Sequence, residues 1–293
     1  MQLLIDGDIV AYRCAASVEP SKKAEPRTLT AEETQFEREI AIARCDTLMR
    51  ELIHTTQADT YTCFLSGKGN FRYQVYPEYK ANRKDTIDPR FRKDCKDFLV
   101  QEWNAVYSEG CEADDLLGIA QTPDSCIASI DKDLLMIPGQ HYNWVRDEKV
   151  FVDEIDGIKH LYKQMIIGDK ADNIFGVVGL GPVKAAKAID HLESEEEMIQ
   201  VVYDLYKEDA KRFLANVQCL WILRKEGETW AHRVNQQTLP NQLQQEVEVM
   251  LSSMKFSMGV TLMEPTTSNL KTFGIPVSGM VAESMETKTV PLM

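Results

Sequence analysis

The chain has 293 residues, of which 44% are hydrophobic, and a formal net charge of -13. This length and composition allow a buried core, either as one large domain or as a domain with an appendage. No segment approaches the roughly 20 unbroken apolar residues of a membrane-spanning helix, and no basic segment with a cleavage site opens the chain, so we expect a soluble protein with no membrane partner.

The chain contains seven cysteines, and no two of them form a Cys-x-x-Cys pair. An odd number of scattered cysteines argues against both a disulfide framework and a zinc site. A reducing cytoplasm is the localisation that fits this pattern.

Three short apolar runs predict buried strands at residues 3–5, 61–65 and 126–130, and each run is followed by a polar or acidic residue. Residues 36–53 and 112–121 have helical apolar spacing. Strands that alternate with helices indicate an α/β domain with a mostly parallel sheet, whose ligands bind at the carboxyl ends of the strands.

Residues 143–152 predict two short strands around a turn, and the chain from 153 to about 225 has mainly helical spacing. After about residue 240 the periodicity weakens, and we expect loose packing or mobility there. The domain prediction is an α/β domain at 1–155, a helical subdomain at 156–235 and a C-terminal extension at 236–293. We find no internal repeat.

Acidic residues occur in four closely spaced sets, most of them directly after an apolar run or a glycine. Any one pair alone suits a helix cap or a solvated surface. Together, so many anions in one cleft would repel one another unless cations held them, and ligands that are all oxygen favour Mg²⁺ or Mn²⁺ over zinc. The sets are Asp6 and Asp8; Glu112, Asp114 and Asp115; Asp131 and Asp133; and Asp169 and Asp172.

Two such cations about 4 Å apart can activate water and stabilise both oxygens of a phosphodiester cleavage, which needs no nucleophilic side chain. We find no convincing Ser/His/Asp or Cys/His set, and none of the five histidines lies beside a plausible nucleophile in the sequence. The sequence therefore favours metal-assisted hydrolysis.

Residues 176–187 read GVVGLGPVKAAK and predict a tight hairpin that leads into a helix. Backbone N–H groups at that helix start, with nearby lysines, suit a phosphate group, although an ordinary turn between packed helices has the same pattern. The candidate nucleic-acid-binding residues here are Gly176, Gly179, Gly181, Lys184 and Lys187.

Residues 71–84 interleave aromatic and basic side chains, which is the pattern of a channel for single-stranded nucleic acid. The alternative is that Tyr73 and Tyr76 belong to the core; Tyr79 and Lys84 are the stronger candidates for nucleic-acid contact. Although the chain is acidic overall, this stretch begins a basic window that runs to about residue 96, so local attraction for phosphate is retained.

In their order along the chain, these motifs resemble those of the 5′-nuclease (flap endonuclease) superfamily, in particular the bacteriophage 5′-to-3′ exonucleases and the 5′-nuclease domain of bacterial DNA polymerase I. The resemblance covers about residues 1–230. It rests on residues 5–7 (Ile-Asp-Gly), 79–83 (Tyr-Lys-Ala-Asn-Arg), 112–115 (Glu-Ala-Asp-Asp), 131–133 (Asp-Lys-Asp) and 168–173 (Gly-Asp-Lys-Ala-Asp-Asn), followed by the glycine hairpin.

The resemblance implies a PIN-like catalytic domain with a helical arch at about residues 70–100 and a helix–hairpin–helix that grips duplex DNA, often with K⁺. It implies two metal sites, one held by Asp6, Glu112, Asp114 and Asp115 and the other by Asp131, Asp133, Asp169 and Asp172. Lys80 and Arg83 would be catalytic cations on the arch, and Tyr79 would stack on the terminal nucleotide. Ser66 stands where the family commonly has an aspartate, and Asp8 is a candidate to compensate.

The resulting hypothesis is a metal-dependent 5′-to-3′ exodeoxyribonuclease of a bacterial or bacteriophage-infected cytoplasm, with flap endonuclease activity and a role in replication or repair beside a polymerase. Two alternatives stay open. One is a primer-removing nuclease of the ribonuclease H type that acts on RNA–DNA hybrids. The other is a non-catalytic DNA-binding protein, for which Ser66 is the supporting feature.

Overall fold

The computed structural model describes residues 1–20, 28–84 and 86–253. A six-stranded sheet lies at the centre, in the order β3-β2-β1-β4-β5-β6. Its first five strands are parallel, and β6 is antiparallel to β5. The strands are β1 (Gln2–Asp6), β2 (Thr60–Lys68), β3 (Val106–Glu109), β4 (Ser125–Ala128), β5 (Gly139–Asn143) and β6 (Glu148–Val152).

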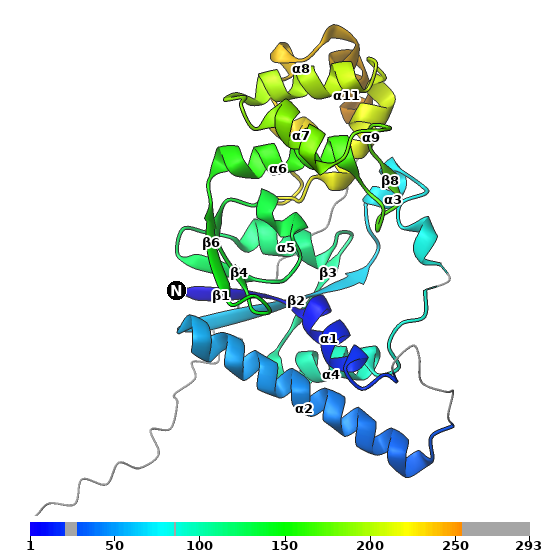
Figure 1. The fold of residues 1–293 in the computed structure, drawn as a ribbon, viewed down its shortest axis with the longest axis vertical. Coiled ribbons are helices and arrows are strands. Elements are labelled where there is room, and N and C mark those ends of the chain that lie inside the picture. The colour runs from blue at the N-terminus through cyan, green and yellow to red at the C-terminus, as the bar shows by residue number, and fades with distance from the viewer. Residues whose placement is uncertain (21–27, 85, 254–293) are drawn as a thin grey trace, which may run out of the picture.

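Helices cover both faces of the sheet (Figure 1). On one face α1, α2 and α4 pack over Leu3, Ile5 and Cys63, and on the other face α5 packs over Leu4 and Phe64. Alternating strand residues therefore enter different cores, as the two-residue repeat of a strand requires. The helices of this part are α1 (Gly7–Ala16), α2 (Ala31–Thr56), α3 (Arg72–Val75), α4 (Arg92–Trp103) and α5 (Ala113–Ala120), with 3₁₀ helices at Ala81–Arg83 and Asp133–Met136.

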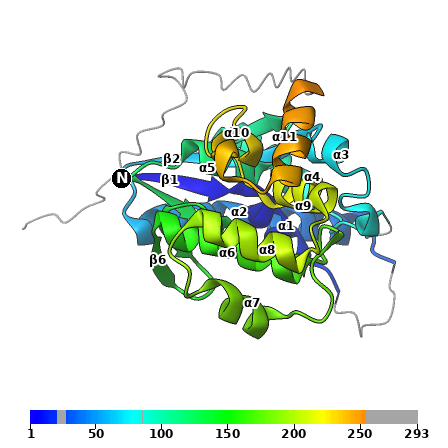
Figure 2. The same ribbon diagram turned by 90° about the horizontal axis from the view of Figure 1, so that it is seen from above.

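The remaining chain forms a helical part that lies above the sheet in Figure 1 and toward the viewer in Figure 2. Its buried residues, including Phe213 and Trp230, belong to the same continuous core as Leu4 and Leu116 of the α/β part. Its elements are α6 (Glu154–Ile167), a small hairpin of β7 (Gly168–Asp169) and β8 (Ile174–Phe175), α7 (Pro182–Ile189), α8 (Glu195–Leu205), α9 (Ala210–Leu220), α10 (Trp230–Arg233), a 3₁₀ helix at Gln236–Thr238 and α11 (Asn241–Ser253).

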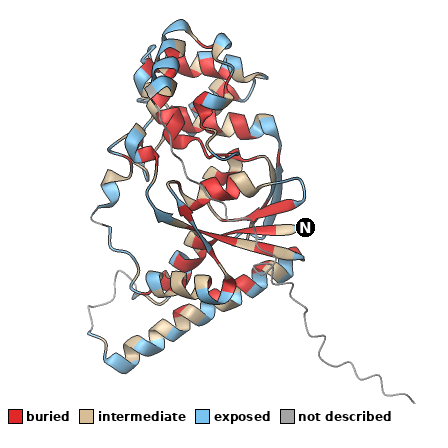
Figure 3. Ribbon diagram, turned by 180° about the vertical axis from the view of Figure 1, so that it is seen from behind, coloured by how far each residue is buried: buried red, intermediate tan, exposed pale blue. Residues whose placement is uncertain are grey.

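The α/β class with a mostly parallel sheet is confirmed, and so are the three predicted strands. The strand pair predicted at 143–152 is present, but its first strand begins earlier, at Gly139, and ends at Asn143. The expectation of loose packing after residue 240 is wrong for Asn241–Ser253, because this segment is helical and buries Leu243 and Val247 completely. Figure 3 shows buried residues in red both in the sheet and in the helical part. Residues 254–293 of that expectation lie outside the described residues.

The helical arch predicted at about residues 70–100 has little helix in its middle part, between α3 and α4. Between α3 and α4 the described residues carry a single 3₁₀ turn, Ala81–Arg83. The helix α4 begins at Arg92 and packs on the body of the domain through Cys95, Leu99 and Trp103. None of the helices in the described part of the chain has the length and apolar character needed to span a bilayer.

Candidate active site

The acidic residues gather at the carboxyl ends of two neighbouring strands. Asp6 ends β1 and caps α1, since its Oδ1 accepts from the backbone N–H of Ile9 at 3.1 Å. Its Oδ2 accepts from Ser129 Oγ at 2.7 Å, directly after β4, and the same Oγ accepts from the backbone N–H of Asp131 at 3.0 Å. Ser129 therefore holds Asp6 and Asp131 together.

Asp114, in the first turn of α5, faces the same point. Burial raises the pKa of Asp114 well above its usual range, and the charges of Asp6, Glu112 and Asp131 raise it further. Burial likewise raises the pKa of Asp6 to about 7, with Asp8 and Asp131 contributing. These carboxylates thus form one group in which ionisation is opposed by burial and by mutual repulsion.

A second acidic group adjoins the first. Asp133 donates its backbone N–H to Asp131 Oδ1 at 2.9 Å, and its own buried Oδ1 accepts no hydrogen bond. Burial and the charges of Asp131 and Asp169 raise the pKa of Asp133 to about 7. Asp169 and Asp172 come from the β7–β8 hairpin, where Asp169 Oδ1 accepts from the backbone N–H of Ala171 at 2.8 Å.

The basic segment 78–83 docks on the loop of that hairpin. Lys80 donates its backbone N–H to the carbonyl of Asp172 at 2.9 Å, and Arg83 Nε donates to the carbonyl of Ala171 at 2.8 Å. Asn82 and Asn173 add side-chain bonds to the carbonyls of Lys170 and Glu78, at 2.7 and 2.9 Å. These hydrogen bonds therefore join the segment 78–83 to the loop between β7 and β8.

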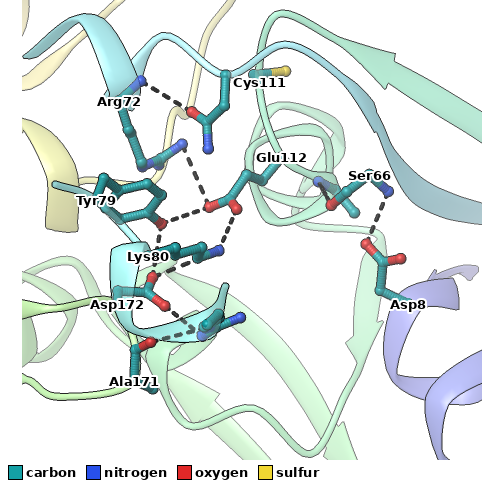
Figure 4. Close-up of polar contacts among 12 residues, drawn as sticks. Asp8, Ser66, Arg72, Tyr79, Lys80, Cys111, Glu112, Ala171 and Asp172 are labelled. Atoms are coloured by element: carbon teal, nitrogen blue, oxygen red, sulfur yellow. Dashed lines mark hydrogen bonds and ion pairs between the residues drawn. The ribbon is translucent and has the colours of Figure 1, made fainter. Parts of the chain in front are cut away.

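This docking brings two cations onto the acids (Figure 4). Lys80 Nζ bonds to Glu112 Oε1 and lies 3.6 Å from Asp172 Oδ2, and Arg83 Nη2 bonds to Asp172 Oδ1. Burial alone would raise the pKa of Glu112, but the charges of Arg72 and Lys80 outweigh it and lower that pKa. Lys84, the next basic residue, is exposed.

The position of Tyr79 does not fit the role that the resemblance implied, which is stacking on the terminal nucleotide. Its side chain is 2% exposed, within the core, and its hydroxyl is 2.8 Å from Glu112 Oε2 and 2.7 Å from Asp172 Oδ2. A ring in this position cannot stack on a base. Tyr73, for which a core position was the alternative, is 49% exposed and packs edge-on against Tyr79.

Asp115 does not join the other acids. It is fully buried and forms a bidentate ion pair with Arg72, with Oδ2–Nη1 and Oδ1–Nη2 distances of 2.6 and 2.8 Å. Its oxygens also accept from the backbone N–H groups of Leu223 and Glu112 at 3.0 and 2.9 Å. Both oxygens are thus fully used, which differs from the prediction that Asp115 is a metal ligand.

Asp8 and Ser66 meet at the carboxyl end of β2. The Ser66 backbone N–H donates to Asp8 Oδ2 at 2.8 Å, and Ser66 Oγ accepts from the backbone N–H of Ala113 at 2.9 Å (Figure 4). Asp8 Oδ1 pairs with Lys96 Nζ. The Asp8 carboxylate therefore occupies the position beside Ser66, but Lys96 already neutralises it.

The glycine hairpin lies at the start of α7. Gly176 packs so closely on Gly168 that a Cβ on Gly176 would come within 2.4 Å of the Gly168 nitrogen, and Gly179 has a φ of +79°. Gly181 caps α7, whose first residue is Pro182. The side chains of Lys184 and Lys187 are exposed, and Lys184 Nζ donates to the carbonyl of Gly179 at 2.9 Å.

Sequence reasoning missed Arg72 and Ser129 as contributors to the site. Arg72 lies in the aromatic and basic stretch, and its sequence context does not distinguish it from exposed basic neighbours. Its side chain is nevertheless only 2% exposed. Ser129 precedes the Asp131 motif by two residues, a position from which a hydroxyl often bonds its own backbone. Within residues 1–20, 28–84 and 86–253, no three His, Cys, Asp or Glu side chains converge closely enough to hold an ion as they stand.

The chain matches one protein-family model and is similar to known proteins in both sequence and fold. Residues 1–165 match the model of the 5′-3′ exonuclease, N-terminal resolvase-like domain. DNA polymerase I of Rhizobium leguminosarum is 28% identical over 151 residues, 44% of this chain and 15% of that protein. DNA polymerase I of Borreliella burgdorferi is 30% identical over 174 residues, 50% of this chain and 19% of that protein. The chain thus spans only a small part of the length of these relatives.

Two solved structures share the fold. The T5 5′-exonuclease with bound zinc has a TM-score of 0.58 at 15% identity, covering 86% of this chain and 99% of that chain. The T5 D15 protein co-crystallised with metal ions has a TM-score of 0.55, also at 15% identity, covering 86% and 98%. The family match extends over more than half of the sequence, so the chain belongs to the 5′-3′ exonuclease N-terminal domain family, a family of 5′ nucleases.

Proposed function

We propose that the chain is a divalent-metal-dependent 5′-to-3′ exodeoxyribonuclease that also cleaves 5′ flaps during DNA replication or repair. The observation that carries this proposal is that Asp6 and Asp131 are joined through Ser129 at the carboxyl ends of β1 and β4, with Asp114 of α5 near enough for their charges to raise its pKa. Membership of a 5′-nuclease family supports the same reaction.

The donor set suits Mg²⁺ or Mn²⁺, because every candidate ligand is a carboxylate. We assign Asp6, Glu112 and Asp114 to one ion, and Asp131, Asp133, Asp169 and Asp172 to the other. When bound, such cations supply an activated water and neutralise the charge of the phosphodiester in the two-metal manner. The buried Asp133 Oδ1 accepts no hydrogen bond, so this oxygen is available as a ligand.

Lys80 and Arg83 act on the phosphate in this proposal. Lys80 Nζ lies between Glu112 of one acidic group and Asp172 of the other, so a phosphate bridging the two groups would meet its ammonium. Arg83 is 48% exposed at its side chain and can turn toward the same phosphate. Both cations would stabilise charge that develops on the phosphate oxygens in the transition state.

The glycine hairpin would bind the DNA backbone without reading sequence. The exposed lysines Lys184 and Lys187 and the N–H groups at the start of α7 suit phosphate oxygens. A potassium ion bound at this hairpin is part of the proposal. Exchange of K⁺ for Na⁺ at constant ionic strength tests the ion, and weaker duplex binding in Na⁺ is the expected result.

The decisive experiment uses duplex DNA labelled at the 5′ or the 3′ end, incubated with the protein in Mg²⁺ or in EDTA. We expect early loss of the 5′ label as mononucleotides or short oligonucleotides, only with metal and not with Asp131→Asn. If the protein cleaved an RNA–DNA hybrid faster than duplex DNA, the proposed substrate would be RNA instead of DNA. Tight DNA binding without cleavage in Mg²⁺ or Mn²⁺ would support the non-catalytic reading instead, and Ser66→Asp would then be the variant to make.

A further inference from the structure

Three cysteines from distant parts of the sequence meet in the core beneath the sheet. Cys14 of α1, Cys45 of α2 and Cys95 of α4 are 5%, 0% and 0% exposed, and they belong to one core cluster. The three helices that carry them pack together on one face of the sheet (Figure 1). In this cluster the Cys45 side chain lies beside those of Cys14 and Cys95. All seven cysteines of the chain are free thiols.

Of these three, Cys14 lines an open cavity. The cavity has a volume of about 330 Å³ and lies between α1, α2 and the turn that joins β5 to β6. Two guanidinium groups border it, and its wall includes a tryptophan with an indole N–H that is buried without a hydrogen-bond partner. The wall is formed by Arg13, Cys14, Arg44, Thr47, Glu51 and Trp144, among others.

The surroundings favour the thiolate of Cys14. The neighbouring Cys45 thiol lowers the pKa of Cys14, and the charges of Arg44 and Arg13 lower it further, which together outweigh burial. Elsewhere burial raises the pKa of the cysteine, to about 11 at Cys126 and about 12 at Cys111. A thiolate beside cations, at the wall of an open cavity and with a second thiol beside it, is the arrangement of an oxidation-sensitive cysteine.

We infer that Cys14 is a site of oxidation by hydroperoxides and that Cys45 resolves it to a disulfide between α1 and α2. In the first step the Cys14 sulfur attacks the O–O bond of H₂O₂, takes one oxygen to become sulfenic acid and releases water. In the second step the Cys45 sulfur attacks the Cys14 sulfur, its thiol proton leaves with the hydroxyl as water, and the S–S bond forms. This inference is independent of the proposed nuclease activity.

The primary test needs no substitution. The reduced full chain is treated with limiting H₂O₂, the remaining thiols are alkylated, and peptides are mapped by mass spectrometry without reduction. We expect the first disulfide to join Cys14 and Cys45, with Cys14 lost at least about tenfold faster than Cys126, because the thiolate fraction changes about tenfold per pKa unit. Equal loss of Cys14 and Cys126, or a first disulfide without Cys14, would overturn the inference.

Two variants separate the steps. Cys45→Ala should stop at the sulfenic acid, which dimedone traps on Cys14, whereas the matched variant Cys126→Ala in the same core should still form the disulfide. Arg44→Gln should slow the loss of Cys14, and Arg50→Gln on the same helix, whose guanidinium pairs with Asp46 at 2.8 Å, should not. Dimedone on Cys45 instead of Cys14 would contradict the assignment.

Discussion

Asp114 and Asp115 are adjacent in the sequence, but we expect replacement by asparagine to affect the stability of the metal-free protein differently at the two positions. In Asp115→Asn, the new amide nitrogen would face Arg72 or the backbone N–H groups of Leu223 and Glu112, all of which are donors. The buried guanidinium of Arg72 would also lose its charge partner. Breaking one side of a buried ion pair costs about 3–5 kcal/mol, which corresponds to a fall of roughly 10 °C in Tm.

Asp114→Asn should behave differently without metal, because it removes a carboxylate that burial and neighbouring anions already disfavour. The assay is thermal unfolding of both variants in EDTA, followed by titration with Mn²⁺. We expect Asp115→Asn to be destabilised in EDTA and Asp114→Asn to be as stable as the parent or more so, but with weaker Mn²⁺ binding. If Asp115→Asn melted like the parent in EDTA and lost Mn²⁺ binding as Asp114→Asn does, the structural role of Asp115 would be refuted.

Three further outcomes are expected. Lys80→Met should lower kcat by about 10²–10³ with a smaller change in KM, because it removes a cation that acts in the transition state; single-turnover cleavage measures this. Asp6 and Asp133, each with a pKa raised from 3.8 to about 7, bind protons more tightly in the folded state than in the unfolded state. Stability in EDTA should therefore fall as pH rises from about 4 to above 7. Melting at pH 6 and pH 8 tests this, and Mg²⁺ should raise Tm more at pH 8. Leu243→Ala should cost about 2–5 kcal/mol in urea unfolding, because α11 belongs to the core; a loss below 1 kcal/mol would mean that α11 is dispensable.

The sequence predicted best the strands in the middle of the sheet. The strands β1, β2 and β4 are central and buried, so continuous apolar runs marked them. The strand β3 was missed because three of its four residues are exposed at the sheet edge. The helix α11 was missed although Leu243, Val247, Met250 and Leu251 have the i, i+4, i+7, i+8 spacing of a helix. The expectation for this segment followed the composition of the residues after it. In β3 packing decided an ambiguous pattern, whereas in α11 the pattern was present.

The position of the acids at strand ends could be predicted, because parallel strands end at one edge of a sheet. What sequence could not supply is which carboxylates remain available there. Glu112, Asp114 and Asp115 are close neighbours in the sequence, yet only Asp115 lies within bidentate reach of Arg72, which is distant in sequence. Tyr79 was likewise assigned to the surface because basic residues follow it, whereas its ring is buried.

The exposure of each cation explains this division among the acids. Arg72 is 2% exposed and bonds to the carbonyls of Cys219 and Trp221 as well as to Asp115, so its release would leave several buried groups unpaired. Lys80 and Arg83 have side chains 18% and 48% exposed and form ion pairs with Glu112 and Asp172. A carboxylate paired with a buried cation is committed to the fold. A carboxylate paired with an accessible cation can exchange that partner for a metal ion, and the cation is then free for the phosphate. On this reasoning, Arg72 stabilises the scaffold, whereas Lys80 and Arg83 hold the site in a form that metal and substrate can enter.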